Sequence, residues 1–373
     1  MPRMRTAVVS DLHLGGVADA DVARGGRPHA ALAEAVAAAD RLVLLGDVVE
    51  LRERPLAQAL EVSRPAFEAL GRALAGRPVV LVPGNHDHAL SEPWLARAQL
   101  SGRPLGSENE WPVTAGEADG PAGVVASWLP RSEVTLAYPG LRLRPDVYAT
   151  HGHYLDLHLT VPRIEAIAAS AMGRVTGLGK SPASATEYET VLAPMYAFYA
   201  GLAQGASAKV LARGGSLSRT VWKRVASDSD GDGALTARAS AVATRFLLGR
   251  VTIPGAVAAL NGLGLGPFSA TLTGEELRRS GLLAMGRVAE VLAPGAEHVI
   301  FGHTHRPGPL EDDEVAEWTT ISGTRLWNSG SWLHEGAFVQ AGRKSPYWPG
   351  TVLTVEDEGP PRLENVLAGA GGE

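Results

Sequence analysis

The chain has 373 residues and a mass of 39.0 kDa, enough for one large α/β domain with an insertion or for two modest domains. Apolar residues make up 45% of the sequence and charged residues 20%, a composition that excludes a disordered chain. The net charge of −6 argues against nucleic-acid binding through a broad basic surface. Because there is no cysteine, disulfides, thiolate metal sites and a cysteine nucleophile are excluded, and any metal must be bound by His, Asp, Glu or Asn.

The first part of the sequence alternates short apolar runs with helical stretches. Strands are predicted at 6–10, 42–45 and 79–82, and helices at 29–40 and 56–75. This alternation is typical of a layered α/β sheet flanked by helices, in which ligand-binding groups gather at the carboxyl ends of the strands. The polar residues that follow each strand are therefore the candidates for a functional site.

The pattern changes between about 155 and 290, where Ala, Gly and Leu dominate and prolines interrupt the helical periodicity. Strand patterns return at 298–301, 318–321, 325–327 and 351–355. We therefore expect a first core part at 1–154, a mostly helical insertion at 155–290 that acts as a cap or an interface, a second core part at 291–365 and a tail at 366–373.

Two uncharged stretches, 190–208 and 251–274, are long enough to be tested as membrane spans. Pro194, Pro254 and Pro267 interrupt them, which favours broken helices over a spanning helix. The N-terminus lacks the apolar stretch and cleavage site of a secretion signal. We expect a cytoplasmic protein whose insertion could contact a membrane peripherally or form a homo-oligomer interface.

Five polar clusters directly follow strand-like runs and contain six of the eleven histidines. In an extended segment, alternate side chains point to one side, so both can reach a common point. A sheet edge can in this way collect several ligands around one or two cations. The clusters are Asp11 and His13, then Asp47 and Glu50, then Asn85, His86 and Asp87, then His151 and His153, and finally His303 and His305.

The order of these clusters, D-x-H, G-D-x-x-E, G-N-H-D, an isolated His block and G-H-x-H, resembles the calcineurin-like metallophosphoesterase superfamily. The resemblance covers roughly 1–154 and 290–335. It implies a layered β-sandwich flanked by helices and a dinuclear metal centre that hydrolyses phosphate bonds, with water as the nucleophile.

The resemblance also implies a division of the ligands. Mixed carboxylate, amide and imidazole donors suit Mn²⁺, Fe²⁺ or Zn²⁺. By analogy with the superfamily, one metal is expected to bind Asp11, His13 and His305 and the other Asn85, His151 and His303, with Asp47 bridging the two.

The remaining polar residues of the clusters have expected roles around the metals. His86 is expected to donate a proton to the leaving group or to stabilise its developing charge, and Asp87 to orient the His86 ring. Glu50 could act as a hydrogen-bond partner, and His88 and His153 could either line the pocket or orient ligands. By contrast, Asp156 and His158 are interpreted as a helix start and a surface residue.

Two further motifs give weaker evidence of a binding site. Residues 228–233 imitate the opening of a calcium-binding loop, but Ala239 stands where a bidentate Glu is needed, so a solvated acidic turn is favoured. The Gly-Leu-Gly-Leu-Gly stretch at 262–266 is interpreted as a flexible bend.

The function expected is a metal-dependent phosphoesterase acting on a phosphomonoester, phosphodiester or pyrophosphate bond of a small-molecule or lipid-linked substrate, with no nucleic acid by default. The apolar cap resembles that of the bacterial UDP-2,3-diacylglucosamine pyrophosphatases. The third cluster departs from their G-N-R-D, because His86 replaces the arginine, and the insertion is longer. A nuclease or cyclic-nucleotide phosphodiesterase, and a metal-binding scaffold without turnover, are the alternatives.

Overall fold

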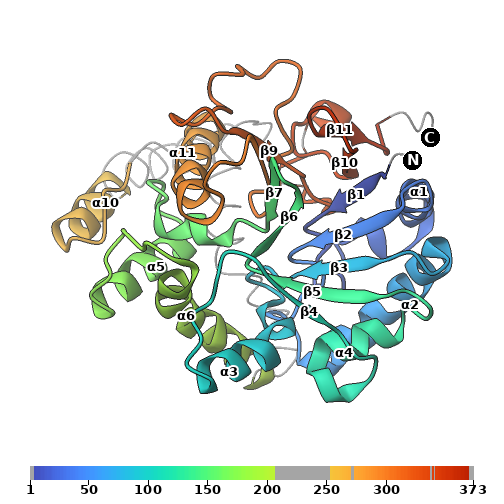
Figure 1. The fold of residues 1–373 in the computed structure, drawn as a ribbon. Coiled ribbons are helices and arrows are strands. Elements are labelled where there is room, and N and C mark those ends of the chain that lie inside the picture. The colour runs from blue at the N-terminus through green and yellow to red at the C-terminus, as the bar shows by residue number, and fades with distance from the viewer. Residues whose placement is uncertain (1–3, 206–252, 270–272, 337, 340, 369–373) are drawn as a thin grey trace, which may run out of the picture.

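Two β-sheets form the centre of the fold. The computed structural model describes residues 4–205, 253–269, 273–336, 338–339 and 341–368 (Figure 1). The larger sheet has the strand order β11-β10-β1-β2-β3-β5-β4, and the smaller sheet has the order β6-β7-β8-β9. In chain order the strands are β1 (Thr6–Val9), β2 (Arg41–Leu45), β3 (Val79–Val82), β4 (Asn109–Pro112), β5 (Val134–Tyr138), β6 (Gly140–Arg144), β7 (Val147–Thr150), β8 (His298–Phe301), β9 (Arg325–Asn328), β10 (Thr351–Val355) and β11 (Arg362–Asn365).

The sheets pack because alternate strand residues bury apolar side chains on both faces. Val8 and Val43, which are register partners on β1 and β2, belong to one core cluster with Ile300 of β8. Their neighbours Ala7 and Leu42 point to the other face, into the core shared with the helices. The expected layered α/β sandwich is confirmed.

The helices cover two sides of the sheets. Helices α1 and α2 lie on one side of the molecule, and α5, α6, α10 and α11 gather on the opposite side (Figure 1). Between β7 and β8, all the elements among the described residues are helical. The boundaries predicted for the helical insertion, 155–290, stay a prediction. The helices are α1 (Gly26–Ala37), α2 (Leu56–Leu74), α3 (Glu92–Leu100), α4 (Gly120–Ser127), α5 (Ile164–Val175), α6 (Ala185–Gly205), α10 (Ile253–Gly262) and α11 (Gly274–Leu292), with the short 3₁₀ turns η1 (Val22–Arg24), η2 (His88–Leu90), η3 (Glu117–Asp119), η4 (His153–Leu157) and η6 (Gly342–Lys344).

The strands predicted in the core are present, but the one predicted at 318–321 is wrong. Only Thr319 forms an isolated bridge there, with Arg325. Trp318 is buried while Ile321 is fully exposed, because the chain turns back at Gly323 before β9 begins. Strands β4 to β7 and β11 have no individual counterpart among the predicted strands.

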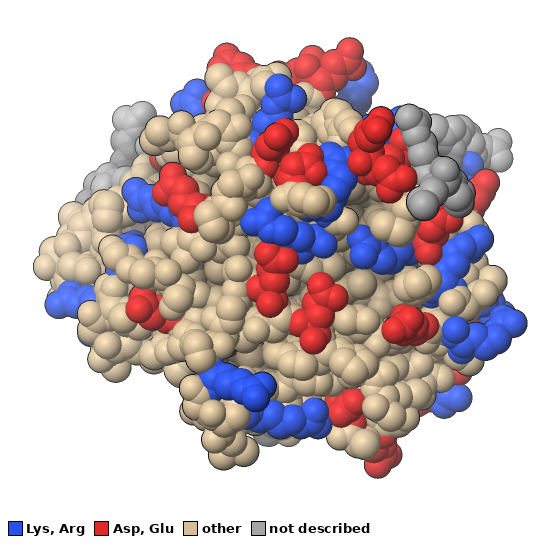
Figure 2. Space-filling view, in the orientation of Figure 1, with Lys and Arg blue, Asp and Glu red and all other residues tan. Residues whose placement is uncertain are grey.

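The structure bears on the expectations about membrane contact, surface charge and the two weaker motifs. No helix among the described residues combines the length and apolar character needed to cross a membrane. Phe198 and Leu202 of α6 are exposed apolar residues of the insertion, and peripheral membrane contact or oligomerisation stays a prediction. Acidic and basic side chains are interspersed over the face shown in Figure 2. The acidic motif at 228–239 lies outside the described residues, and 262–266 forms the turn after α10.

Candidate metal centre

The predicted site residues follow the carboxyl ends of five strands, three in one sheet and two in the other. Strands β1, β2 and β3 are parallel neighbours, as are β7 and β8. Parallel strands end at the same edge, so the loops after them meet. The five loops carry Asp11 and His13, Asp47 and Glu50, Asn85 to Asp87, His151, and His303 with His305.

The backbone at this edge adopts a conformation that non-glycine residues rarely use. Asp11, His13, Asp47, His303 and His305 all have positive φ, between 44° and 64°. Such positions cost on the order of 1–3 kcal/mol each and cluster at functional sites. Five predicted ligands therefore share a left-handed backbone that the surrounding fold must maintain.

The glycines of the motifs make room for the ligands. A Cβ atom added to Gly84 would overlap Asp47 and His151, and one added to Gly302 would overlap the Asp11 carboxylate. Gly46 has the same relation to the His151 ring. The glycines that precede Asp47, Asn85 and His303 are therefore needed for close approach of backbone and side chain.

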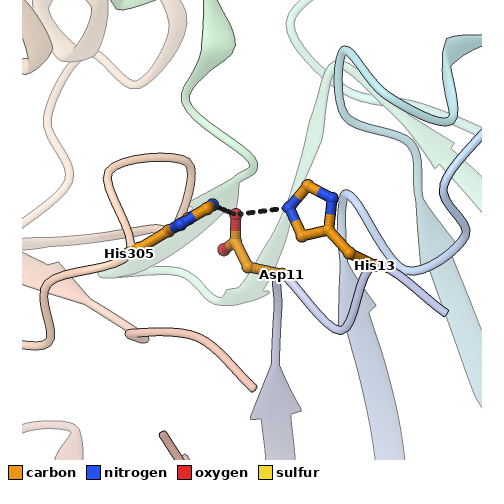
Figure 3. Close-up of side chains that lie close together, drawn as sticks. All are labelled: Asp11, His13 and His305. Atoms are coloured by element: carbon orange, nitrogen blue, oxygen red, sulfur yellow. Dashed lines mark ion pairs between the residues drawn. The ribbon is translucent and has the colours of Figure 1, made fainter. Parts of the chain in front are cut away.

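A first group of donors consists of Asp11, His13 and His305 (Figure 3). Asp11 lies between the two imidazole rings, with its Oδ1 3.3 Å from His305 Nε2 and 4.0 Å from His13 Nε2. Asp11 and His13 are buried. Asp11 Oδ1 and His13 Nε2 have no hydrogen-bond partner among the described residues.

A second group is formed by Asp47, His151 and His303. Asp47 Oδ2 lies 3.1 Å from His151 Nε2 and 3.8 Å from His13 Nε2, so this oxygen stands between the two groups. Asn85 brings its amide to within 3.1 Å of His303 Nδ1. The structure thus brings together all seven residues predicted as ligands, and their division between two metals stays a prediction.

These residues fit a divalent cation. Buried donor atoms without partners, such as Asp11 Oδ1 and His13 Nε2, are costly unless something binds them. Carboxylate oxygens and imidazole nitrogens together suit borderline divalent ions. Two further groups of possible ligands occur among the described residues. His13, Glu50 and His86 form one, which shares His13 with the first donor group. Asp146, Glu297 and His298 form the other, which differs because Arg144 already binds both oxygens of Asp146.

The buried carboxylates of the site favour the binding of positive charge, either as protons on the histidines or as a cation. Burial opposes protonation of His13, yet its hydrogen bond to Glu50 and the nearby Asp47 raise its pKa to about 10. Burial acts likewise on His151, whose pKa Asp47 raises to about 9. Burial opposes ionisation of Asp11 and Asp47, but the neighbouring histidines hold both pKa values below the ordinary range. Without a cation, protons on the imidazoles balance the carboxylates.

Glu50 orients two rings. Its Oε2 lies 2.9 Å from His13 Nδ1 and 2.7 Å from His86 Nδ1. Despite burial, which opposes ionisation, these histidines keep the pKa of Glu50 low. The second nitrogen of His13, Nε2, therefore faces the donor group.

The role predicted for Asp87 as the partner of the His86 ring is wrong. The Asp87 carboxylate is fully buried and accepts hydrogen bonds from the backbone amides of Gly84, Asp47, Val48 and Val49. Burial and the nearby Asp47 raise its pKa to about 6. Asp87 thus holds the loops after β2 and β3 together, and Glu50 takes the orienting role.

His88 and His153 contact the helical side of the site and do not line the cavity that opens over the donor groups. His153 Nε2 lies 3.2 Å from the Tyr138 hydroxyl, and burial and the neighbouring His151 lower its pKa well below the ordinary value. His88 Nε2 lies 3.2 Å from Glu189 of α6. Glu189 also accepts hydrogen bonds from the Tyr138 and Tyr154 hydroxyls.

Asp156 and His158 differ from their sequence interpretation, because both are buried. The turn η4 brings Asp156 Oδ1 to 3.0 Å from His303 Nε2, while His158 Nε2 lies 2.7 Å from the Tyr188 hydroxyl. Burial opposes ionisation of Asp156, but His303 and the positive charges of Arg163 and Arg52 lower its pKa. Asp156 thereby fixes the ring of a predicted ligand, a role for which the spacing of the motif carries no signal.

A cavity of about 280 Å³ opens over the donor groups. Its floor includes His13, Asp47 and His303. Its walls come from segments without a recognisable motif, namely the start of α5, helix α11 and residues 333–347, with Arg163, Glu165, Leu277, Phe338 and Tyr347 among the lining residues.

A two-sheet sandwich whose strand ends gather Asp, Asn and His donors under a cavity defines a metal-dependent phosphoesterase fold and site. Residues 4–169 match the family model of the calcineurin-like phosphoesterases, the superfamily that the motifs at the strand ends resemble. His303 and His305 lie outside the matched range and join the site through β8. No curated protein matches the chain.

Proposed function

We propose that the protein is a hydrolase that uses two divalent cations to cleave a phosphomonoester, phosphodiester or pyrophosphate bond. The position of Asp47 carries this proposal, since a single carboxylate oxygen lies within 4 Å of a histidine nitrogen from each donor group. A shared carboxylate of this kind can serve two cations that together bind one phosphoryl group.

The ligands divide as the donor groups do. Asp11, His13 and His305 would hold one cation, and Asn85, His151 and His303 the other, with Asp47 shared; Mn²⁺, Fe²⁺ or Zn²⁺ suit this set. When bound, the cations polarise the phosphoryl group and make a water molecule acidic enough to attack it near neutral pH.

His86 supplies the proton for the leaving group. It lines the cavity, and Glu50 binds its Nδ1, which leaves Nε2 as the nitrogen directed at substrate. As the phosphorus–oxygen bond breaks, the proton on Nε2 passes to the departing oxygen. The negative charge of Glu50 stabilises the ring while it carries this proton.

The helical insertion acts as a cap in this proposal. Glu165 of α5, Leu277 of α11 and the preceding Arg163 form walls of the cavity. The cavity volume favours a small organic phosphate, and several apolar side chains in the lining favour an organic group over inorganic polyphosphate.

The test combines metal analysis with a substrate screen. We expect purified protein loaded with Mn²⁺ to contain two ions per chain and to hydrolyse p-nitrophenyl phosphate or bis-p-nitrophenyl phosphate, and chelation to abolish both properties. His86→Ala should keep both ions and lower kcat about 10²-fold or more. Two bound ions without turnover of either ester or of pyrophosphate would instead support a metal-binding scaffold.

A further inference from the structure

Arg163 is a cation in the wall of the cavity that has no polar partner among the described side chains. It immediately precedes α5, and its Nε atom is buried without a hydrogen-bond partner in the part of the chain that the structure describes. Its guanidinium forms no hydrogen bond or ion pair with another described residue. A buried donor of this kind is costly unless a ligand binds it, and guanidinium groups bind phosphate oxygens in a bidentate manner.

Glu165 lies two residues further on, in the first turn of α5, and lines the same cavity. Its side chain is more than nine-tenths buried, at 8% exposure, and its Oε2 accepts no hydrogen bond from the described residues. Arg163 and Glu165 do not pair with each other. A carboxylate oxygen in this state needs a donor, such as a hydroxyl or amino group.

The surroundings give Arg163 a particular importance. The described residues that line the cavity include the carboxylates of Asp21, Glu53, Glu165 and Glu335 besides those of the donor groups, and Arg163 is the one Arg or Lys among them. An anionic substrate that enters this cavity therefore meets Arg163 as the only permanently charged cationic side chain in that lining. Arg163 lines the same cavity as Asp47 and His303 of the second donor group.

We propose that the start of α5 recognises the substrate, with Arg163 binding an anionic oxygen of its phosphate group and Glu165 accepting a hydrogen bond from a hydroxyl group of its alcohol part. The substrate class that follows is a phosphate ester of a hydroxyl-bearing alcohol, such as a polyol or a sugar. This inference rests on the proposed hydrolase function and adds its specificity.

The test uses n-propyl phosphate and glycerol 3-phosphate, which have similar leaving groups but differ in two hydroxyls. With Mn²⁺-loaded protein, the wild type should have the higher kcat/KM for glycerol 3-phosphate. Arg163→Gln should lower kcat/KM for both esters by roughly 10- to 100-fold, with partial recovery in Arg163→Lys. Glu165→Ala should lower it about tenfold for glycerol 3-phosphate alone, and Glu165→Gln, which keeps an acceptor, should lose less.

Arg103→Gln is the matched control, because Arg103 is exposed and outside the cavity lining. Equal kcat/KM of the wild type for the two esters, or equal losses on both in Glu165→Ala, would overturn the assignment of Glu165. Unchanged kinetics in Arg163→Gln would overturn that of Arg163.

A binding measurement separates this inference from the proposed function. Inorganic phosphate is titrated calorimetrically into Mn²⁺-loaded wild type and Arg163→Gln. If the wild type hydrolyses no ester but binds phosphate at least tenfold more tightly than the variant, the recognition site stands and the hydrolase proposal fails. If the two proteins bind phosphate equally and the wild type hydrolyses an ester, the hydrolase proposal stands and the recognition site fails.

Discussion

His13 and His151 at the sheet edge have electrostatic surroundings opposite to those of His153 and His158 beneath the helical insertion, although His151 and His153 are two residues apart. Burial alone would keep all of them neutral. At the edge, carboxylates outweigh burial and raise the pKa values of His13 and His151 to about 10 and 9. Beneath the insertion, burial and positive neighbours lower the pKa of His158 to about 4 and that of His153 well below its ordinary value.

The difference separates a cation site from a structural core. At the edge, protons on the imidazoles supply the positive charge that balances the carboxylates. A divalent ion would replace these protons, because an imidazole must be neutral to bind a metal. Beneath the insertion, neutral rings form hydrogen bonds with tyrosine hydroxyls, as His153 does with Tyr138 and His158 with Tyr188. The same residue type thus belongs to the donor groups in one region and, through the His158–Tyr188 hydrogen bond, holds α6 against the core in the other.

The largest expected effect comes from removing the carboxylate that the two donor groups share. Asp47→Ala should lose both ions together and lower kcat by at least about 10³-fold, because each group loses the charge that holds its cation. Metal content per chain and kcat measure this. Asp312→Ala, at an exposed position, is the control. Retention of both ions in Asp47→Ala would contradict a shared ligand.

A smaller effect is expected at the residue that orients two edge rings. Glu50→Gln keeps the size of the side chain but removes the charge beside His13 and His86. Metal affinity or kcat should fall roughly 10- to 100-fold, as is usual for partners of metal ligands. Competitive chelator titration and steady-state kinetics measure the two quantities, with Glu61→Gln on exposed α2 surface as the control. Wild-type values of both would show that Glu50 does not orient these rings.

The two regions also differ in how far the sequence predicts them. Most ligands at the edge follow strands β1, β2, β3 and β8, whose apolar runs are visible locally, whereas His151 follows β7, which has no individual counterpart among the predicted strands. The resemblance to the superfamily supplies their expected grouping. The predicted partner of His86 is wrong because Asp87 and Glu50 both lie near it in sequence, and only the folded loops decide which reaches the ring. Asp156 and Arg163 depend on how the insertion packs over the edge, which no local pattern encodes.

Substitution of a histidine beneath the insertion should have the smallest effect on catalysis. Its expected effect is on how the stability of the fold depends on pH. His158 is neutral in the folded protein, since burial, Arg287 and Lys180 lower its pKa from 6.5 to about 4. Above pH 6.5 the folded and unfolded states bind no proton there. Between pH 6.5 and 4 only the unfolded state binds one, so acidification should cost the fold up to about 3 kcal/mol through this residue.

His158→Gln isolates that contribution, because glutamine can bind the Tyr188 hydroxyl but does not titrate. Urea unfolding of metal-free wild type and variant at pH 7 and pH 4.5 gives the loss of unfolding free energy for each, and the loss should be smaller in the variant by roughly 2–3 kcal/mol. His334→Gln, at an exposed position, controls for substitution of a histidine as such. If wild type and His158→Gln lost the same unfolding free energy on acidification, His158 would be protonated in the folded state. The pKa of His158 would then not be lowered, and the contrast with the histidines at the edge would not extend to this residue.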